Sequence, residues 1–241
     1  MKPKLLVLAS TFPGTPGDGT PAFVLDLAWQ QAKDFDVTVL TPMTPGAAPT
    51  EIMPSPDGST SVAVVRYRYF LKRWEDLAHG AILDNLKAKK SRLLQVPLLA
   101  HGLFWGTRRL VKELSPAAIH AHWVIPQGIL ATLAAPSVPL LVTTHGGDIY
   151  ALNAGPILTL KRWVFGRAKA ITTVNSQMKA TLVEWVQPAD KISLLPMGVD
   201  TRSVGELAAN TAKIAGQMLV VGRLVEKKGI EYLFDALRLL Q

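Results

Sequence analysis

Apolar and polar positions along the chain follow two different periods, and the two periods alternate. Short runs that are apolar throughout are typical of strands buried on both faces of a parallel sheet. Longer segments with apolar residues every three or four positions separate these runs and are typical of helices. We therefore predict strands at Lys4–Ala9, Val37–Leu40, Val62–Tyr67, Ala118–Ala121, Leu140–Thr143, Ala170–Val174 and Ile192–Leu195. We predict helices at Ala22–Ala32, Leu77–Lys90, Val96–Leu114, Gln127–Ala135, Ile157–Arg167 and Gln177–Val186.

This alternation predicts an α/β fold with a doubly wound, Rossmann-like parallel sheet over residues 1–200. Five prolines in Pro42–Gly58 predict a loop or an excursion from the sheet there. Residues 201–216 are polar and rich in alanine, and we expect them to be a connector. Residues 217–241 then show an apolar strand, a glycine turn and a helix. Because one strand–helix unit cannot bury both faces of its strand, we expect residues 217–241 to be the first unit of a truncated second Rossmann-like domain.

Composition indicates the cellular compartment that we expect for the protein and whether its chain could cross a membrane. The 241 residues contain no cysteine, which excludes a disulfide framework and a thiolate metal site and favours the cytoplasm. The longest apolar stretch, Leu93–Trp105, is interrupted by Gln95, Pro97 and His101 and is shorter than the roughly 20 residues that cross a bilayer. The sequence does not indicate an oligomeric state.

The net charge of +8 is concentrated in one part of the chain. Residues 66–112 contain eleven Lys and Arg but only three Asp and Glu, together with several Tyr, Phe and Trp. Lys87, Lys89, Lys90 and Arg92 cluster at the end of a predicted helix. Basic residues beside aromatic residues are typical of a peripheral site on an anionic membrane, which would be the inner face of the membrane. The alternative is a solvated basic face whose apolar residues belong to the core. The pattern disfavours nucleic acid, since no recognition motif and no stacking pattern accompany the charge.

Polar and glycine-rich segments follow several predicted strands, at the edge where ligands of such sheets bind. The first is the loop of Gly17 and Gly19, which is either a ligand loop or a flexible surface loop and does not match a dinucleotide fingerprint. The second holds His120 and His122, which alternation places on one face of a strand. A metal pair is conceivable there, but we expect histidines satisfied by neighbouring groups because no third ligand is evident.

The third segment is Thr144-His145-Gly146-Gly147-Asp148. The His145 imidazole can donate to an oxyanion or phosphate, and Asp148 can accept from sugar hydroxyls. The alternative is a turn with a helix cap.

A fourth candidate lies near the C-terminus, where Arg223 and Lys228 stand between an apolar run and a helix. Two cations at a helix N-terminus suit a diphosphate, although they are also compatible with a solvated surface.

Five motifs occur together and in order: His120–Trp123, Thr144–Asp148, Thr173–Ser176, Leu195–Asp200 and Val221–Gly229. With these motifs the sequence resembles the GT-B glycosyltransferases, and specifically glycosyltransferase family 4, over almost the whole chain. The resemblance implies two Rossmann-like domains around a cleft, an acceptor in the first domain, and a nucleotide-sugar in the second. It also implies retaining transfer to a hydroxyl acceptor, lipid-linked in many relatives, with the NDP-sugar as a substrate and no cofactor or metal.

By this resemblance, His145 would contact the transferred sugar and support the transition state. Arg223 and Lys228 would neutralise the leaving diphosphate, with Gly17 and Gly19 approaching it from the other side. The acceptor and sugar would be bound by His122, Gly146, Asp148 and Ser176.

The sequence departs from the family in lacking most of the donor domain, including a pair of glutamates that holds the donor. We therefore expect the 241-residue chain to be inactive alone. The alternative from another class is a non-catalytic module that binds an acceptor or a membrane surface.

Overall fold

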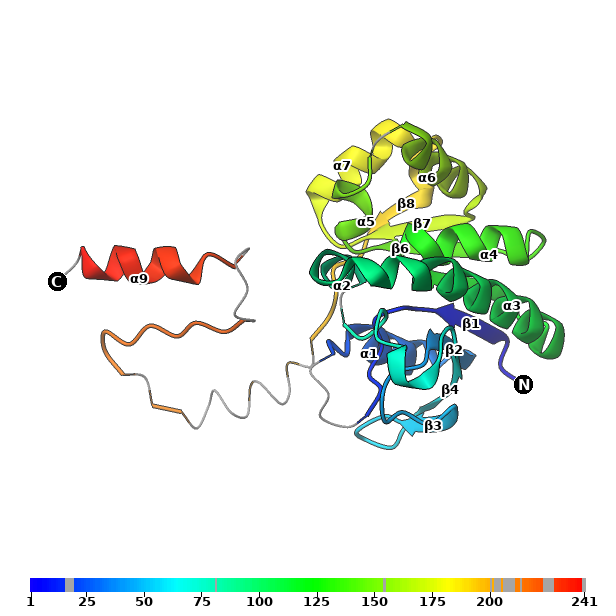
Figure 1. Cartoon of the computed structure of the whole chain (residues 1–241), viewed down its shortest axis with the longest axis horizontal. Coiled ribbons are helices and arrows are strands. Elements are labelled where there is room, and N and C mark those ends of the chain that lie inside the picture. The colour runs from blue at the N-terminus through cyan, green and yellow to red at the C-terminus, as the bar shows by residue number, and fades with distance from the viewer. Residues whose placement is uncertain are drawn as a thin grey trace. The chain divides into compact units, whose positions relative to one another are not determined.

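The computed structural model describes residues 1–15, 20–80, 82–153, 155–199, 201, 205, 211–212, 214–222 and 228–239. The chain divides into two compact units, Met1–Val199 and Asp200–Gln241. The first unit contains the sheet and the helices that cover it (Figure 1). In the second unit, the described helix is α9, Ile230–Arg238.

The first unit is built on an eight-stranded sheet with the order β3-β4-β2-β1-β5-β6-β7-β8. Every neighbouring pair in it is parallel except β3 and β4, which are antiparallel. The strand order changes direction next to β1, which pairs with β2 on one side and β5 on the other. The strands are β1 (Lys4–Leu8), β2 (Asp36–Pro42), β3 (Thr50–Pro54), β4 (Ser61–Tyr67), β5 (Ala118–His122), β6 (Leu140–Thr144), β7 (Ala170–Thr173) and β8 (Ile192–Leu194). This confirms the predicted α/β fold class.

Helices cover both faces of the sheet, and β1 shows why its sequence is apolar throughout. Leu6 and Leu8 belong to one core cluster, whereas Leu5 and Val7 belong to another on the opposite face. The first cluster includes residues of α3, α4, α6 and α7, and the second includes residues of α1. The helices of this unit are α1 (Phe23–Gln31), α2 (Ile82–Ala88), α3 (Val96–Leu114), α4 (Ile129–Ala134), α5 (Gly147–Tyr150), α6 (Gly155–Arg167) and α7 (Ser176–Trp185).

Helix α3 approaches the sheet closely because two glycines face it. A Cβ atom at Gly102 would lie 2.6 Å from the Tyr67 ring, and one at Gly106 would lie 3.1 Å from Leu40. The observed bounds of α3 match the predicted helix. The structure thereby joins the end of β4 to the start of β5 by a long crossover on one face of the sheet.

Three sequence predictions about local structure were wrong. The proline-rich loop contains β3, which pairs with β4 as an edge strand, where prolines are tolerated. The helix expected at Leu77–Lys90 is shorter: α2 begins at Ile82, while Leu77 and Ala78 are buried in the preceding loop. The apolar strand expected at the start of residues 217–241 does not form over the described residues 217–222, where Leu219 and Val221 are 84% and 86% exposed. A single strand without a paired neighbour has no partner for its backbone groups.

Candidate functional site

Three histidines from two neighbouring strands lie together at the carboxyl ends of the sheet. His120 and His122 are in β5, and His145 directly follows β6. The parallel register places His122 opposite Thr143, two positions before His145. The Nδ1 atom of His122 is 3.0 Å from the Nε2 atom of His145, and their rings stack at 5.2 Å between centroids. The predicted site residues His122 and His145 are therefore brought into direct contact.

Aromatic rings surround the His145 imidazole. The Trp123 ring centroid is 4.5 Å from that of His145, and the Phe23 centroid is 5.0 Å away. Trp123 directly follows β5 with a positive φ of 75°, an uncommon backbone conformation for a bulky residue. Sequence reasoning did not identify Phe23, which comes from α1 and is far from His145 in the chain. Trp123 was part of a recognised motif but had no assigned role.

His120 is held by hydrogen bonds on both sides of its ring. The Gln31 amide lies 2.9 Å from His120 Nδ1, and His120 Nε2 lies 2.7 Å from Thr143 Oγ1. The Thr143 hydroxyl is in turn 2.6 Å from Thr172 Oγ1 on β7. This agrees with the expectation of a histidine satisfied by its neighbours. Gln31, Thr143 and Thr172 were not among the sequence-predicted site residues.

Burial keeps all three imidazoles neutral near pH 7. It lowers the pKa of His120 to about 3 and the pKa of His145 to about 4. The pKa of His122 is also lowered, first by burial and then by the neighbouring His120 and His145. A low-dielectric environment disfavours the charged form of histidine. His145 is thus available as a neutral donor or acceptor of a hydrogen bond.

Asp148 braces the backbone of the His145 loop. Its Oδ1 accepts from the backbone N–H groups of His145 and Gly146 at 3.0 and 3.1 Å. Its Oδ2 accepts from the backbone N–H of Val124 at 3.1 Å, and the residue is only 6% exposed. Burial raises the pKa of this carboxyl, and the backbone hydrogen bonds oppose the rise. The structure therefore places Asp148 as a link between the loops after β5 and β6, where we had predicted a contact with sugar hydroxyls.

The remaining predicted residues occupy different environments. Gly146 has a φ of 99°, which an L side chain rarely adopts, and it precedes α5. Ser176 is exposed at the start of α7, whose cap is Asn175, accepting from the Met178 N–H. Lys228 is exposed in the second unit. Gly17, Gly19 and Arg223 lie outside the described residues.

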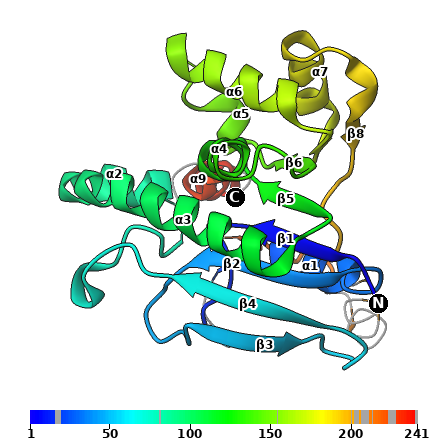
Figure 2. The same ribbon diagram turned by 90° about the vertical axis from the view of Figure 1, so that its right-hand side faces the viewer.

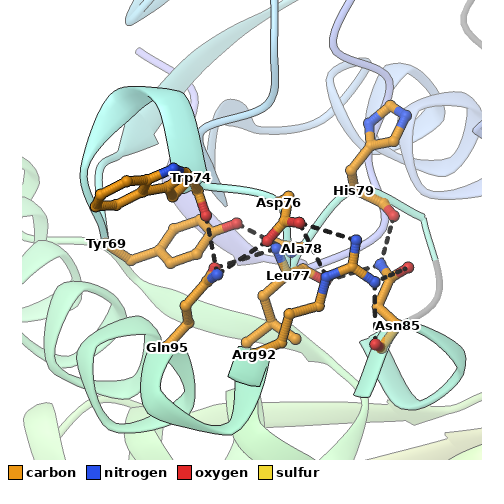
Figure 3. A network of polar contacts seen from close by, with 9 residues as sticks. All are labelled: Tyr69, Trp74, Asp76, Leu77, Ala78, His79, Asn85, Arg92 and Gln95. Carbon is orange, nitrogen blue, oxygen red and sulfur yellow. Dashed lines mark hydrogen bonds and ion pairs between the residues drawn. The ribbon is translucent and has the colours of Figure 1, made fainter. Parts of the chain in front are cut away.

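The predicted basic cluster separates into two kinds of residue. Lys87, Lys89 and Lys90 are exposed. Arg92 is instead paired with Asp76, with Nε and Nη2 at 3.0 and 2.9 Å from Oδ2 (Figure 3). Its Nη1 also donates to the Asn85 carbonyl oxygen at 3.0 Å. Arg92 therefore holds this segment together, and its guanidinium is not a free surface charge.

The described residues show three further features. No group of three or more His, Asp and Glu side chains is arranged to hold a metal ion within this part of the chain. Among the described helices, none combines the length and the apolar character needed to span a membrane. A cavity of about 220 Å³ lies near the amino ends of β5 and β6, away from the histidines, and is lined by Ile119, Ala131, Thr132, Ala135, Pro136, Val138, Leu140 and Arg167.

Solved structures of other proteins share the fold of this chain. A sucrose-phosphate synthase structure from Thermosynechococcus elongatus aligns with a TM-score of 0.53 at 13% identity, covering 86% of this chain and 95% of that one. The Anabaena protein HepE, solved in complex with UDP, aligns with a TM-score of 0.51 at 17% identity. That alignment covers 97% of this chain and 57% of HepE. The fold is that of the GT-B glycosyltransferases.

The sequence model of Glycosyltransferase Family 4 matches residues 17–203, and the chain belongs to this family. A curated relative, the teichuronic acid biosynthesis glycosyltransferase TuaC of Bacillus subtilis (strain 168), is 27% identical. That alignment covers 99% of this chain and 63% of TuaC, so the chain spans less than two thirds of the relative's length.

Proposed function

We propose that the protein takes part in retaining transfer of a sugar from a nucleotide-sugar to a hydroxyl acceptor, without a metal ion. The main support is the position of His145, which lies at the carboxyl ends of the strands in contact with His122 and is neutral near pH 7. The chain also belongs to family 4. Such a group can hydrogen-bond an oxygen on which charge develops, without first losing or gaining a proton. The first unit would bind the acceptor, with Ser176 and Gly146 at the same edge of the sheet as His145.

The donor part of the proposal is supported by HepE, whose structure contains UDP. Arg223 and Lys228 would neutralise the diphosphate of the donor, and the loop of Gly17 and Gly19 would approach it from the first unit. TuaC is named for teichuronic acid biosynthesis, which supports a carbohydrate hydroxyl as the acceptor. We expect the 241 residues alone to bind the donor poorly, since Arg223 and Lys228 would act there without the glutamate pair of the family.

The proposal is tested by comparing two forms of the protein: the 241-residue chain and a donor-complete form, meaning the same residues joined to a full donor domain. Release of NDP from a panel of UDP- and GDP-sugars is measured with and without candidate acceptors. We expect acceptor-dependent release from the donor-complete form and none above background from the 241 residues. A folded donor-complete form that binds acceptor but releases no NDP with any donor would instead favour the non-catalytic module.

We further propose that the protein works at the inner face of a membrane on a lipid-linked acceptor, and that the contact is made by the basic arm, defined as residues 68–98. The arm exposes Lys87, Lys89 and Lys90 beside large apolar side chains. Trp74 is 50% exposed, Leu93 is 58% exposed and Leu94 is 72% exposed. Lysines next to exposed Trp and Leu suit the boundary between headgroups and acyl chains.

A polar network around the buried side chains of Glu75 and Gln95 gives the basic arm a defined shape. Gln95 donates to the Trp74 carbonyl oxygen and to Asp76 Oδ1, both at 2.9 Å (Figure 3). Glu75 accepts from the Tyr69 N–H and from Arg68, at 2.7 and 3.0 Å. The acidic residues Glu75 and Asp76 are thus paired with Arg68 and Arg92. Lys89 adds only a longer-range attraction to Asp76, and Lys87 and Lys90 form no ion pair among the residues that the structure describes.

The arm lies at the same end of the sheet as the histidines. Strand β4 ends at Tyr67, the arm follows, and α3 then runs back across the sheet to the start of β5. Figure 2 shows α2 beyond the end toward which the arrows of β1, β4 and β5 point. A membrane bound to the arm would therefore present a lipid-linked acceptor to the edge of the sheet that carries His145.

We expect replacement of Lys87, Lys89 and Lys90 by Gln to weaken binding to vesicles that contain anionic lipid by up to roughly a hundredfold, since each base near the surface contributes about 1 kcal/mol. Liposome flotation measures the change, and wild-type binding should fall as salt is raised. The matched control replaces Lys4, Lys33 and Lys169, which are exposed near the amino ends of the strands. Equal flotation of the arm variant and the wild type would exclude the arm as the membrane site. Arg92 is left unchanged because it stabilises the arm.

A further inference from the structure

Two nitrogens of the histidine cluster have no hydrogen-bond partner among the residues that the structure describes. His122 is fully buried, and its Nδ1 is engaged with His145 Nε2 at 3.0 Å. Its Nε2 is buried and unpaired among the described residues. The Nδ1 of His145 likewise has no partner in this part of the chain, but His145 is only half-buried. The latter nitrogen is therefore the one placed to meet a ligand.

The single proton between the two rings has two possible positions. Both rings are neutral near pH 7, so each ring carries one N–H group. If His122 donates from Nδ1, then its bare Nε2 is the unpaired buried atom and His145 carries its own proton on Nδ1. If His145 donates from Nε2, then His122 is left with a buried, unpaired Nε2–H group and His145 Nδ1 is bare.

The environment of His122 favours the first arrangement. Orphaned buried N–H groups are rarer in native proteins than under-satisfied buried acceptors. We extend this ranking to the imidazole nitrogen, whose single lone pair would be left unpaired. His120 cannot relieve an unpaired Nε2–H on His122, because both nitrogens of His120 already have partners in Gln31 and Thr143. The lower-energy state thus leaves His122 Nε2 as an unpaired acceptor.

We propose that His122 is a positioning residue that holds His145 as its Nδ1–H tautomer and so directs an N–H donor toward the ligand edge of the sheet. A donor at this position stabilises negative charge on an oxygen, whereas the other tautomer would present a lone pair and act as a base. The identity of that oxygen, on the transferred sugar or the leaving diphosphate, rests on the proposed glycosyl transfer. The tautomer itself does not.

The direct test is nitrogen NMR on the 241-residue chain, with ¹⁵N-labelled histidine at pH 7. We expect the shifts and two-bond couplings of both His122 and His145 to show a protonated Nδ1 and a bare Nε2. A His145 signal with a protonated Nε2 would overturn the proposal. This measurement needs no turnover, so it is independent of whether the proposed function is correct.

Two variants separate positioning from packing. In His122→Asn, the amide can still donate from about the position of Nδ1, and we expect His145 to keep its Nδ1–H tautomer. In His122→Leu, no donor remains, and we expect His145 to shift toward the Nε2–H form. Retention of the Nδ1–H form in a folded Leu variant would also overturn the proposal. If the Leu variant does not fold, the wild-type and Asn spectra still decide.

Turnover of the donor-complete form then tests the link to catalysis. We expect kcat of the His122→Leu variant to fall at least roughly tenfold, with a smaller change in KM, and the Asn variant to recover most of the loss. A tautomer that shifts as expected while kcat stays unchanged in both variants would leave the positioning role intact and count against the proposed role of His145 in transfer.

Discussion

Replacing His145 with Ala in the donor-complete form is expected to lower kcat by roughly two to three orders of magnitude, the usual effect of removing one hydrogen-bond donor that stabilises developing charge. The residue lies at the carboxyl ends of the strands between Trp123 and Phe23, where water is partly excluded and a hydrogen bond is stronger. Its pKa is lowered to about 4, so the reactive form at pH 7 is neutral. Steady-state NDP release with saturating donor measures the loss.

Two comparisons show whether the loss at His145 comes from chemistry. His145→Asn places an amide donor near the position of Nδ1, and we expect it to recover part of the lost kcat. His101→Ala removes an exposed imidazole on α3 and should leave kcat unchanged. The unfolding transition of each variant in urea shows whether the fold is retained. A folded Ala variant with near-normal kcat would mean that His145 is only a turn residue.

The second large effect is expected from Asp148→Ala, which should reduce the free energy of unfolding by about 3 kcal/mol or more. The change removes the acceptor of three backbone N–H groups, those of Val124, His145 and Gly146, in a buried setting. A buried donor left without an acceptor costs about 1–3 kcal/mol. Urea unfolding at pH 7, followed by circular dichroism, measures the difference.

Asp148→Asn should lose less stability than Asp148→Ala, because the amide oxygen still accepts and the neutral side chain avoids the desolvation that raises the carboxyl pKa. Asp34→Ala, at an exposed position, is the control and should change stability by less than about 0.5 kcal/mol. If Asp148→Ala unfolds at the same urea concentration as the wild type, then the loop after β6 is not held by this carboxylate in solution.

Much of the fold could be predicted because each element carries its own local signal. Strand β1 is apolar on both faces because both faces are covered, and its four consecutive apolar residues Leu5–Leu8 show this in the sequence. Helix α3 begins and ends at the predicted residues because its apolar spacing persists and Ser115 ends it in a left-handed conformation. Strand β3 was missed because its pairing with β4 is a long-range property that prolines conceal.

The candidate site was predicted in part. That His122 and His145 approach one another follows from the rule that parallel strands bring their carboxyl ends to one edge. The local contacts of Asp148 with the His145 and Gly146 N–H groups fit the turn that was left open as the alternative, but its link to Val124 and the pairing of Arg92 did not follow from the sequence. These two partners, Val124 for Asp148 and Asp76 for Arg92, are more than a dozen residues away along the chain.

The sequence by itself determined the α/β class, most strand and helix positions, the family resemblance and the segment that carries the excess charge, because neighbouring residues encode these properties. Tertiary structure alone decided which polar atoms are paired and which are free. It placed Phe23 and Trp123 around His145, paired Arg92 with Asp76, and left Lys87, Lys89 and Lys90 in solvent. The physical reason is that hydrogen bonding and desolvation depend on atoms brought together from distant parts of the chain, and these set the pKa of His145 and the tautomer that we infer for it.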